Sequence, residues 1–246
     1  MHKTENYTLG KGKLLFQPAG TNGFIDLGNS PNFTVSQAVE KKEHFSSRSG
    51  LQVKDATVVT KITGAGKFTL DEPNITNLNF FIMGDVIADI SQTSGSLTLQ
   101  AFTAREDKWI SLGKRKLSSV VVKDVADAIT YVLGTDYVLD ADAGLLMALS
   151  TGAIVEADVL HVSCSYAAVT MNRADGGSKT QWEGDFWFVG DPPQGKIQDV
   201  KGYVNLAPDG DIPMIGEDWQ SFGFTVEFVD NANYNGVPEF HDRGVV

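Results

Sequence analysis

Residues 219–229 alternate apolar and polar side chains with a period of two. The apolar positions are Phe222, Phe224, Val226 and Phe228, and the intervening positions are Gly223, Thr225 and Glu227. Successive side chains of a β-strand point to opposite faces, so this run predicts a strand with one buried and one exposed face. Comparable runs at 96–103, 160–166 and 181–189 extend the prediction to a chain that is mainly β.

The spacing of these runs predicts two packed antiparallel sheets, sandwich-like or barrel-like, with one short flanking α-helix. Roughly ten short runs are separated by turns rich in Gly, Asp, Asn and Pro. A helix is predicted from Pro73 to Gly84, because Pro and acidic residues suit a helix start and Gly suits its end. Its predicted apolar face consists of Ile75, Leu78, Phe81 and Ile82. No linker-like tract interrupts the chain, so we expect a single domain over residues 1–246.

Composition argues against several classes of protein. A formal net charge of −11 over 246 residues disfavours a protein that grips nucleic acid, because phosphate binding depends on Lys and Arg. Hydrophobic residues make up 42% of the chain, which is too many for global disorder. The single cysteine, Cys164, can form no disulfide within the chain, and its alternation with Leu160 and Val162 predicts burial. The sequence also lacks an apolar signal core at its start and any run near the ~18 apolar residues of a membrane span.

No constellation of residues predicts catalysis, a metal site or a cofactor. Asp136, Asp140 and Asp142 precede Gly144 as in a calcium loop, but the EF-hand spacing fails and an Asp/Gly turn explains them. The four histidines form no zinc-type pair, and no Gly-x-Ser-x-Gly motif marks a nucleophile. We therefore predict a protein that is not an enzyme and needs no cofactor.

Residues 37–50 are polar and charged with little apolar periodicity, and we interpret them as a long exposed loop or hairpin. Long ordered connections in compact domains tend to be functional. This pattern fits a contact with another subunit and a solvated surface equally well. The segments 1–8 and 230–246 are polar, and we expect them to become ordered only when subunits assemble.

The first 85 residues resemble the major tail tube proteins of long-tailed, siphophage-like bacteriophages. An ordered series of short signals carries the resemblance, and no single one is specific. These signals are LGKGKLLF at 9–16, FIDLGN at 24–29 with Pro31, Phe33 and Val35, EHFSS at 43–47 with Gly50, the pair Lys54 and Asp55, FTL at 68–70, and the helix-like segment 74–84. Residues 131–166 resemble a β segment of phage virion proteins less closely.

The resemblance implies a structural virion protein whose hexameric rings stack into the hollow tail tube. Genomic DNA would pass through the lumen without specific binding, and the other partners would be a tape measure protein and tail tip or terminator proteins, with no membrane contact. The protein would assemble in the host cytoplasm and reside in the phage tail. A loop at about 35–57 would contact the next ring. The residues expected to make this contact are Glu40, Lys41, Lys42, Glu43, His44, Phe45, Arg48, Lys54 and Asp55.

A minimal tail tube domain is shorter than this chain, so a possible inserted β segment is expected at about 114–169. Two rival functions fit the sequence. One is a tail terminator or adaptor, which caps the tube. The other is a carbohydrate-binding β-sandwich, whose sugar-stacking candidates are Trp109, Trp182, Trp187 and Trp219. The apolar strand faces predicted around Trp182 and Trp219 favour core packing for these two side chains.

Overall fold

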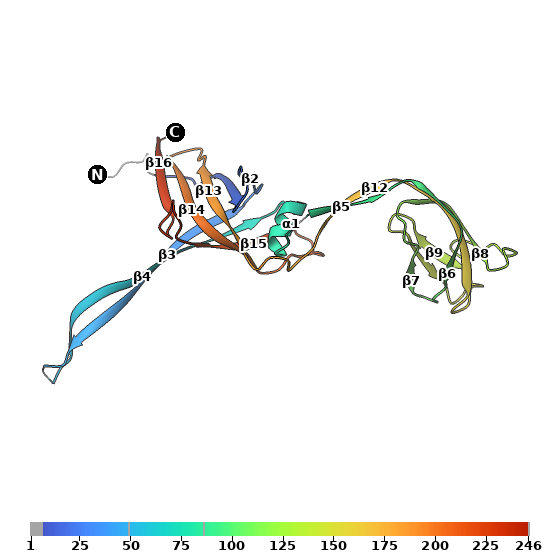
Figure 1. Cartoon of the computed structure of the whole chain (residues 1–246), viewed down its shortest axis with the longest axis horizontal. Helices are drawn as coiled ribbons and strands as arrows, with labels where there is room; N and C mark the ends of the chain where they lie inside the picture. The colour runs from blue at the N-terminus through green and yellow to red at the C-terminus, as the bar shows by residue number, and fades with distance from the viewer. Residues whose placement is uncertain (1–6, 49, 86, 246) are drawn as a thin grey trace. The chain divides into compact units, whose positions relative to one another are not determined.

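The structure is a computed structural model that describes residues 7–48, 50–85 and 87–245. It is mainly β, with several antiparallel sheets and, in the described residues, a single short helix, which confirms the predicted fold class (Figure 1). The chain divides into two compact units. Unit 1 is formed by Met1–Ile87 with Ala174–Val246, and unit 2 by Ala88–Arg173. The expected inserted segment at 114–169 lies within unit 2, whose bounds are wider.

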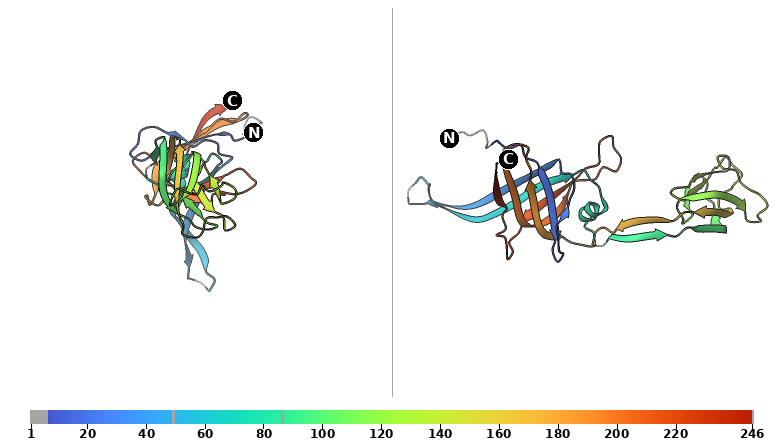
Figure 2. Two further views of the ribbon diagram at one scale, coloured as in Figure 1. Left: turned by 90° about the vertical axis from the view of Figure 1, so that its right-hand side faces the viewer. Right: turned by 90° about the horizontal axis from the view of Figure 1, so that it is seen from above.

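Unit 1 is built on one eight-stranded sheet in which every neighbouring pair of strands is antiparallel. The strand order is β2-β1-β13-β14-β15-β4-β3 (Figure 2). Strand β14 is long enough to pair with β16 through residues 196–201 and with β15 through residues 204–209. The sheet leaves β3 as an open edge and does not close into a barrel over the described strands. The strands are β1 (Gly12–Pro18), β2 (Ile25–Asp26), β3 (Asn32–Ser46), β4 (Val53–Leu70), β13 (Trp182–Gly190), β14 (Lys196–Asp209), β15 (Phe222–Phe228) and β16 (Glu239–Val245).

The alternating run at 219–229 forms β15, and its predicted inward face is confirmed. Phe222, Phe224, Val226 and Phe228 are all buried, while Glu227 is exposed. The ring of Phe224 lies 5.2 Å from that of Phe68 and 5.9 Å from that of Phe81, measured between centroids. This aromatic cluster holds the sheet against the segment that contains the helix.

Helix α1 (Ile75–Phe81) begins after Asn74, whose side chain caps it by accepting a hydrogen bond from the backbone N–H of Asn77 at 2.9 Å. The prediction of its buried face was wrong. The buried helical residues are Asn77, Asn79 and Phe80, and the four predicted apolar positions are only half-buried. The amide of Asn77 donates to the carbonyl of Leu27, so a polar side chain takes an inward position by bonding to backbone.

Two long strands form the hairpin that was one of the two alternatives for residues 37–50. Strand β3 has 15 residues and continues through the charged segment, so the hairpin alternative is the one observed. Strand β4 has 18 residues and runs unbroken past Gly64 and Gly66. A Cβ on Gly66 would lie 2.9 Å from the carbonyl oxygen of Thr34, so this glycine allows close packing and does not end the strand.

Unit 2 has its own core of buried side chains, with Val122, Leu146, Leu160 and Val162 at its centre, and Cys164 is buried there as predicted. Within the alternating run at 96–103, Leu99 is 42% exposed, because its positive φ of 47° and a bulge in its own strand interrupt the alternation. The strands are β5 (Ile87–Gln92), β6 (Gly95–Thr103), β7 (Trp109–Ser111), β8 (Leu117–Asp124), β9 (Tyr137–Asp140), β10 (Leu145–Ala148), β11 (Val159–Tyr166) and β12 (Val169–Ala174). They form sheets in the orders β7-β10-β9, β6-β11-β8 and β12-β5.

The chain end is anchored, contrary to the prediction for 230–246. Strand β16 pairs with β14, and Arg243 reaches the buried carboxylate of Asp199 with its Nη2 at 2.9 Å. Asp199 also accepts hydrogen bonds from the backbone N–H of Gly190 and from the indole N–H of Trp187. Residues 1–6 of the other polar end lie outside the described residues.

We expect Asp199→Ala to lower the free energy of unfolding by about 2 kcal/mol, because it leaves the buried N–H of Gly190 and other donors without an acceptor. Arg243 is half-exposed and adds little to this cost. Urea denaturation measures the change. The control is Asp242→Ala, an exposed carboxylate on the neighbouring strand β16, which we expect to shift stability by no more than about 0.5 kcal/mol. Equal effects of the two changes would contradict the anchoring role.

Candidate self-association surfaces

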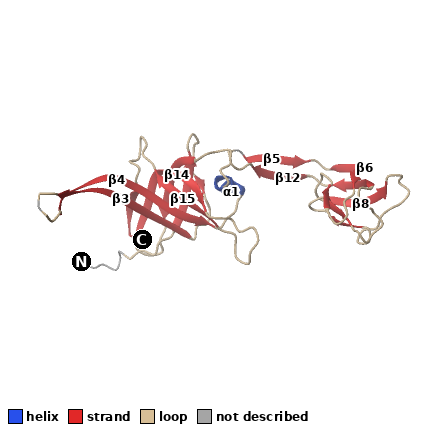
Figure 3. Cartoon of the chain, turned by 90° about the horizontal axis from the view of Figure 1, so that it is seen from below, coloured by secondary structure: helices blue, strands red, loops and turns tan. Residues whose placement is uncertain are grey.

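The outer halves of β3 and β4 form a two-stranded arm, residues 37–62, that extends away from the sheet (Figure 3). Within the described part of the arm every residue except Ser46 is exposed. Isolated two-stranded hairpins are marginally stable in water, and an open strand edge tends to pair with another chain. The arm therefore has the properties of a segment that another molecule covers.

One face of the arm carries an apolar stripe, which we define as Val39, Phe45, Val59 and Ile62. The register pairs Val39 with Ile62, Lys41 with Val59, and Phe45 with Lys54. By strand alternation this face is the one on which Phe33 packs against the core of unit 1. Each stripe residue is between 46% and 50% exposed. The core-facing side of the sheet thus continues outward as an uncovered apolar surface.

Ion pairs tie the two strands of the arm together. His44 Nδ1 lies 2.5 Å from Asp55, Lys54 pairs with Glu43, and Lys61 Nζ lies 3.5 Å from Glu40. All six side chains are exposed, so each pair contributes little free energy and serves mainly to keep the register.

The structure places all nine residues expected to contact another subunit on this arm. Five of the nine side chains lie within ion-pairing reach of a cross-strand partner, and the partner of Glu40 is Lys61, which was not among the nine. Phe45 joins the stripe, whereas Lys41, Lys42 and Arg48 have no carboxylate within ion-pairing distance in the described chain. Sequence reasoning missed Val39, Val59 and Ile62, whose spacing becomes a single face only when the strand register is known.

A second exposed apolar surface lies on the loop between β14 and β15, residues 210–221. Met214, Ile215 and Trp219 are 77%, 98% and 93% exposed. The prediction that Trp219 packs in the core was wrong, because β15 begins only at Phe222. Beside Trp219 is an open hollow of about 540 Å³, whose lining residues are Asp71, Glu72, Pro73, Asn74, Trp219 and Gln220.

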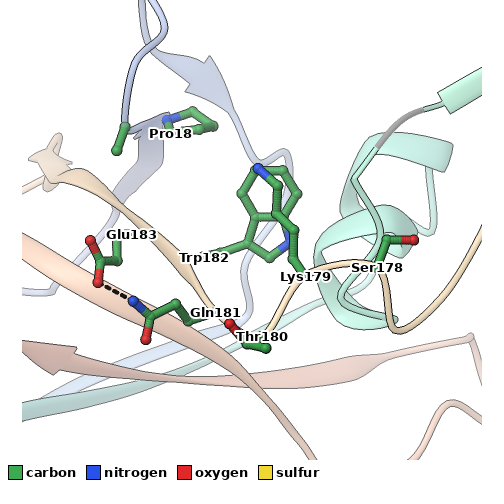
Figure 4. A pocket seen from close by; sticks show the side chains of 8 residues that line it. Pro18, Ser178, Lys179, Thr180, Gln181, Trp182 and Glu183 are labelled. Atoms are coloured by element: carbon green, nitrogen blue, oxygen red, sulfur yellow. Dashed lines mark hydrogen bonds between the residues drawn. The ribbon is translucent and has the colours of Figure 1, made fainter.

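Another sugar-stacking candidate in unit 1, Trp182, is buried as predicted. The ammonium of Lys179 covers its ring at 3.9 Å from the centroid, and the ring of Phe80 packs against it at 4.8 Å. Lys179 and Trp182 line an open hollow of about 390 Å³. Figure 4 shows both side chains, together with the hydrogen bond from Gln181 to Glu183. A ring covered in this way leaves no free face on which a sugar could stack.

Two of the three carboxylates compared with a calcium loop accept hydrogen bonds from the backbone of unit 2. Asp136 accepts hydrogen bonds from the N–H groups of Val132 and Ala153, and Asp140 accepts one from Ala143. Across the described residues no three His, Cys, Asp or Glu side chains gather as a metal site would require. No helix in that part of the chain is long and apolar enough to cross a membrane.

Acid is expected to weaken unit 2 through Asp136. The two backbone hydrogen bonds hold the pKa of its carboxyl below the ordinary value. Stability from Asp136 is therefore fully present above the unfolded-state pKa of about 4 and is lost as the pH falls through the lowered folded-state pKa. Urea denaturation at pH 7 and at about pH 3 measures this loss, and Asp136→Asn should reduce it. An unchanged pH dependence in the variant would rule out this role.

A family model with the description "Protein of unknown function UCP028589" matches residues 7–233. The chain belongs to that family. The UCP028589 match covers the arm, the β14–β15 loop and the whole of unit 2. A comparison with curated proteins finds no match.

Proposed function

We propose that this protein is the subunit of a phage tail tube, in which hexameric rings stack through the arm. The observation that carries the proposal is the apolar stripe, which extends the core-facing side of the sheet onto a strand pair exposed on both faces. Burial of such a stripe removes apolar surface from water, and the open edge of β3 offers backbone groups to a neighbour.

The charge of the chain supports a tube that carries DNA without binding it. At −11 per subunit, a ring of several copies repels the phosphate backbone and lets it slide. In this proposal a tape measure protein occupies the growing tube, and tail tip and terminator proteins close its ends.

Negative-stain electron microscopy of the purified protein, concentrated to roughly the millimolar range, tests this function. Rings or hollow tubes with a central channel are expected. The matched variant replaces residues 39–62, which carry the whole apolar stripe, by an Asn-Gly turn between Ala38 and Thr63, which are paired in the register of β3 and β4. It should remain folded but form no tubes. Val35 stays in this variant because it packs against the core.

The rival functions give different results in the same experiment. A terminator or adaptor would form rings that do not stack, at any concentration. A carbohydrate-binding module has one observation in its favour, the nearly complete exposure of Trp219. It would remain dispersed and bind glycans on an array. Dispersed protein at all concentrations, even after addition of short tube seeds, would count against the tube subunit.

A further inference from the structure

We infer that the β14–β15 loop of one copy is the docking surface for the arm of a second copy of this chain. The inference deepens the self-assembly proposed above and rests on it. It assigns the arm a partner surface made of Met214, Ile215, Trp219 and the hollow beside them. Two independent observations, complementary charge and the separation of the two surfaces, select this occupant.

The two surfaces are both apolar at their centres and oppositely charged around them. The arm has five basic and three acidic residues, in a chain whose net charge is −11. The loop has three acidic residues, Asp211, Glu217 and Asp218, and no basic one. Asp71 and Glu72 add acidity at the hollow. Opposite charges around an apolar centre steer two surfaces together and fix their register.

On each of the two surfaces some charged side chains form no ion pair with another described residue of the same copy. Among the described residues, no ion pair involves Lys41 or Lys42 of the arm, and none involves Glu217 or Asp218 of the loop. The nearby Asp209, by contrast, is already paired with Lys67. The unpaired cations and the unpaired carboxylates are thus available to one another in an assembly.

The tip of the arm cannot reach the loop of its own chain. The loop ends at Ser221, next to the pairing of Phe222 with Leu70, whereas the tip of the arm lies beyond Val53 at the other end of β4. Seventeen residue steps along a strand span roughly 55 Å. A closed loop of twelve residues reaches out by only about 20 Å. The arm and helix α1, which adjoins the loop, also lie at opposite ends of the sheet (Figures 1 and 3).

The contact therefore joins different surfaces of two copies. Such a head-to-tail interface leaves a free arm on one copy and a free loop on the other, so it repeats until it closes into a ring or extends into a filament. Because donor and acceptor lie at opposite ends of one long strand, this contact propagates along the direction of β4.

Disulfide trapping tests the inference without any need for tubes. Two variants of the full chain carry Val53→Cys and Ile215→Cys, and the buried Cys164 is left in place. Under mild oxidation the mixture should form at least about tenfold more covalent dimer than either variant alone. In this head-to-tail contact position 53 of one copy lies beside position 215 of the next, so two identical variants do not bring their cysteines together. The control pairs Ile215→Cys with Val125→Cys, an exposed position of unit 2. A mixture no better than the single variants or the control would overturn the inference.

Charge reversal in the same assay tests specificity. Adding Glu217→Lys and Asp218→Lys to the loop variant should lower the dimer yield by about tenfold at low salt, and Lys41→Glu with Lys42→Glu on the arm variant should restore it. Failure of this rescue would overturn the charge assignment.

The two proposals can fail separately. If tubes form while the cysteines stay unlinked, the result supports the proposed function and overturns the docking surface. If the cysteines link while no tube forms, the result supports the contact between arm and loop and overturns the proposed tube function.

Discussion

The double substitution Phe45→Asp and Val59→Asp is expected to raise the protein concentration needed for assembly by at least about 100-fold. Both side chains belong to the apolar stripe and are roughly half exposed in the isolated chain. Burial of an apolar side chain of this size is worth about 1.5 kcal/mol or more, and a carboxylate in its place must be desolvated. Two such losses amount to about 3 kcal/mol, which corresponds to a factor of about 100 in an association constant.

Sedimentation velocity over a concentration series measures this shift. Stability to urea should change little, because neither side chain contacts the core of unit 1. The matched control is the double substitution Ala56→Asp and Val58→Asp, which places the same two charges on the opposite face of the same arm. An equal loss of assembly in the control would show that the effect comes from charge on the arm and not from the stripe.

The strands that line the core were predictable because the core itself sets their period. In β15 every second residue is buried, and in β13 Trp182 and Phe186 are buried with Phe188 half-buried on the same face, so alternation appears in the sequence. The outer part of β3 gives no such signal, since both of its faces are exposed in this chain. Its extended form comes from pairing with β4, a long-range interaction that periodicity cannot reveal.

The candidate site was only partly predictable for the same reason. The charged residues of the arm could be identified because they form an unusually polar segment of the sequence. The apolar stripe could not, because its residues share one face only through the cross-strand register. Trp219 was predicted to pack in the core because it lies next to the alternating run of β15. It belongs instead to the loop, which ends only after Ser221. The bounds of unit 2 were also not predicted from the sequence. No Pro- or Gly-rich linker marks them, and the unit begins and ends with the paired strands β5 and β12.

Phe224→Ala is expected to lower the free energy of unfolding by about 3 to 5 kcal/mol, the range typical of a large aromatic residue removed from a packed core. Its side chain is 1% exposed, and its ring contacts those of Phe68, Phe81 and Phe222. The cavity left by the ring would be enclosed by rigid neighbours on two strands and the helix, so relaxation can recover little of the loss. Urea denaturation followed by tryptophan fluorescence measures the change.

Phe240→Ala is the matched control, since Phe240 lies on β16 of the same sheet and is 64% exposed. Its removal should alter stability by no more than about 0.5 kcal/mol. A loss below about 1 kcal/mol for Phe224→Ala would contradict its place at the centre of the core. Together with the stripe variants, this pair separates two uses of aromatic side chains on one sheet: Phe224 stabilises the fold of a single copy, whereas Phe45 contributes only when a second copy covers it.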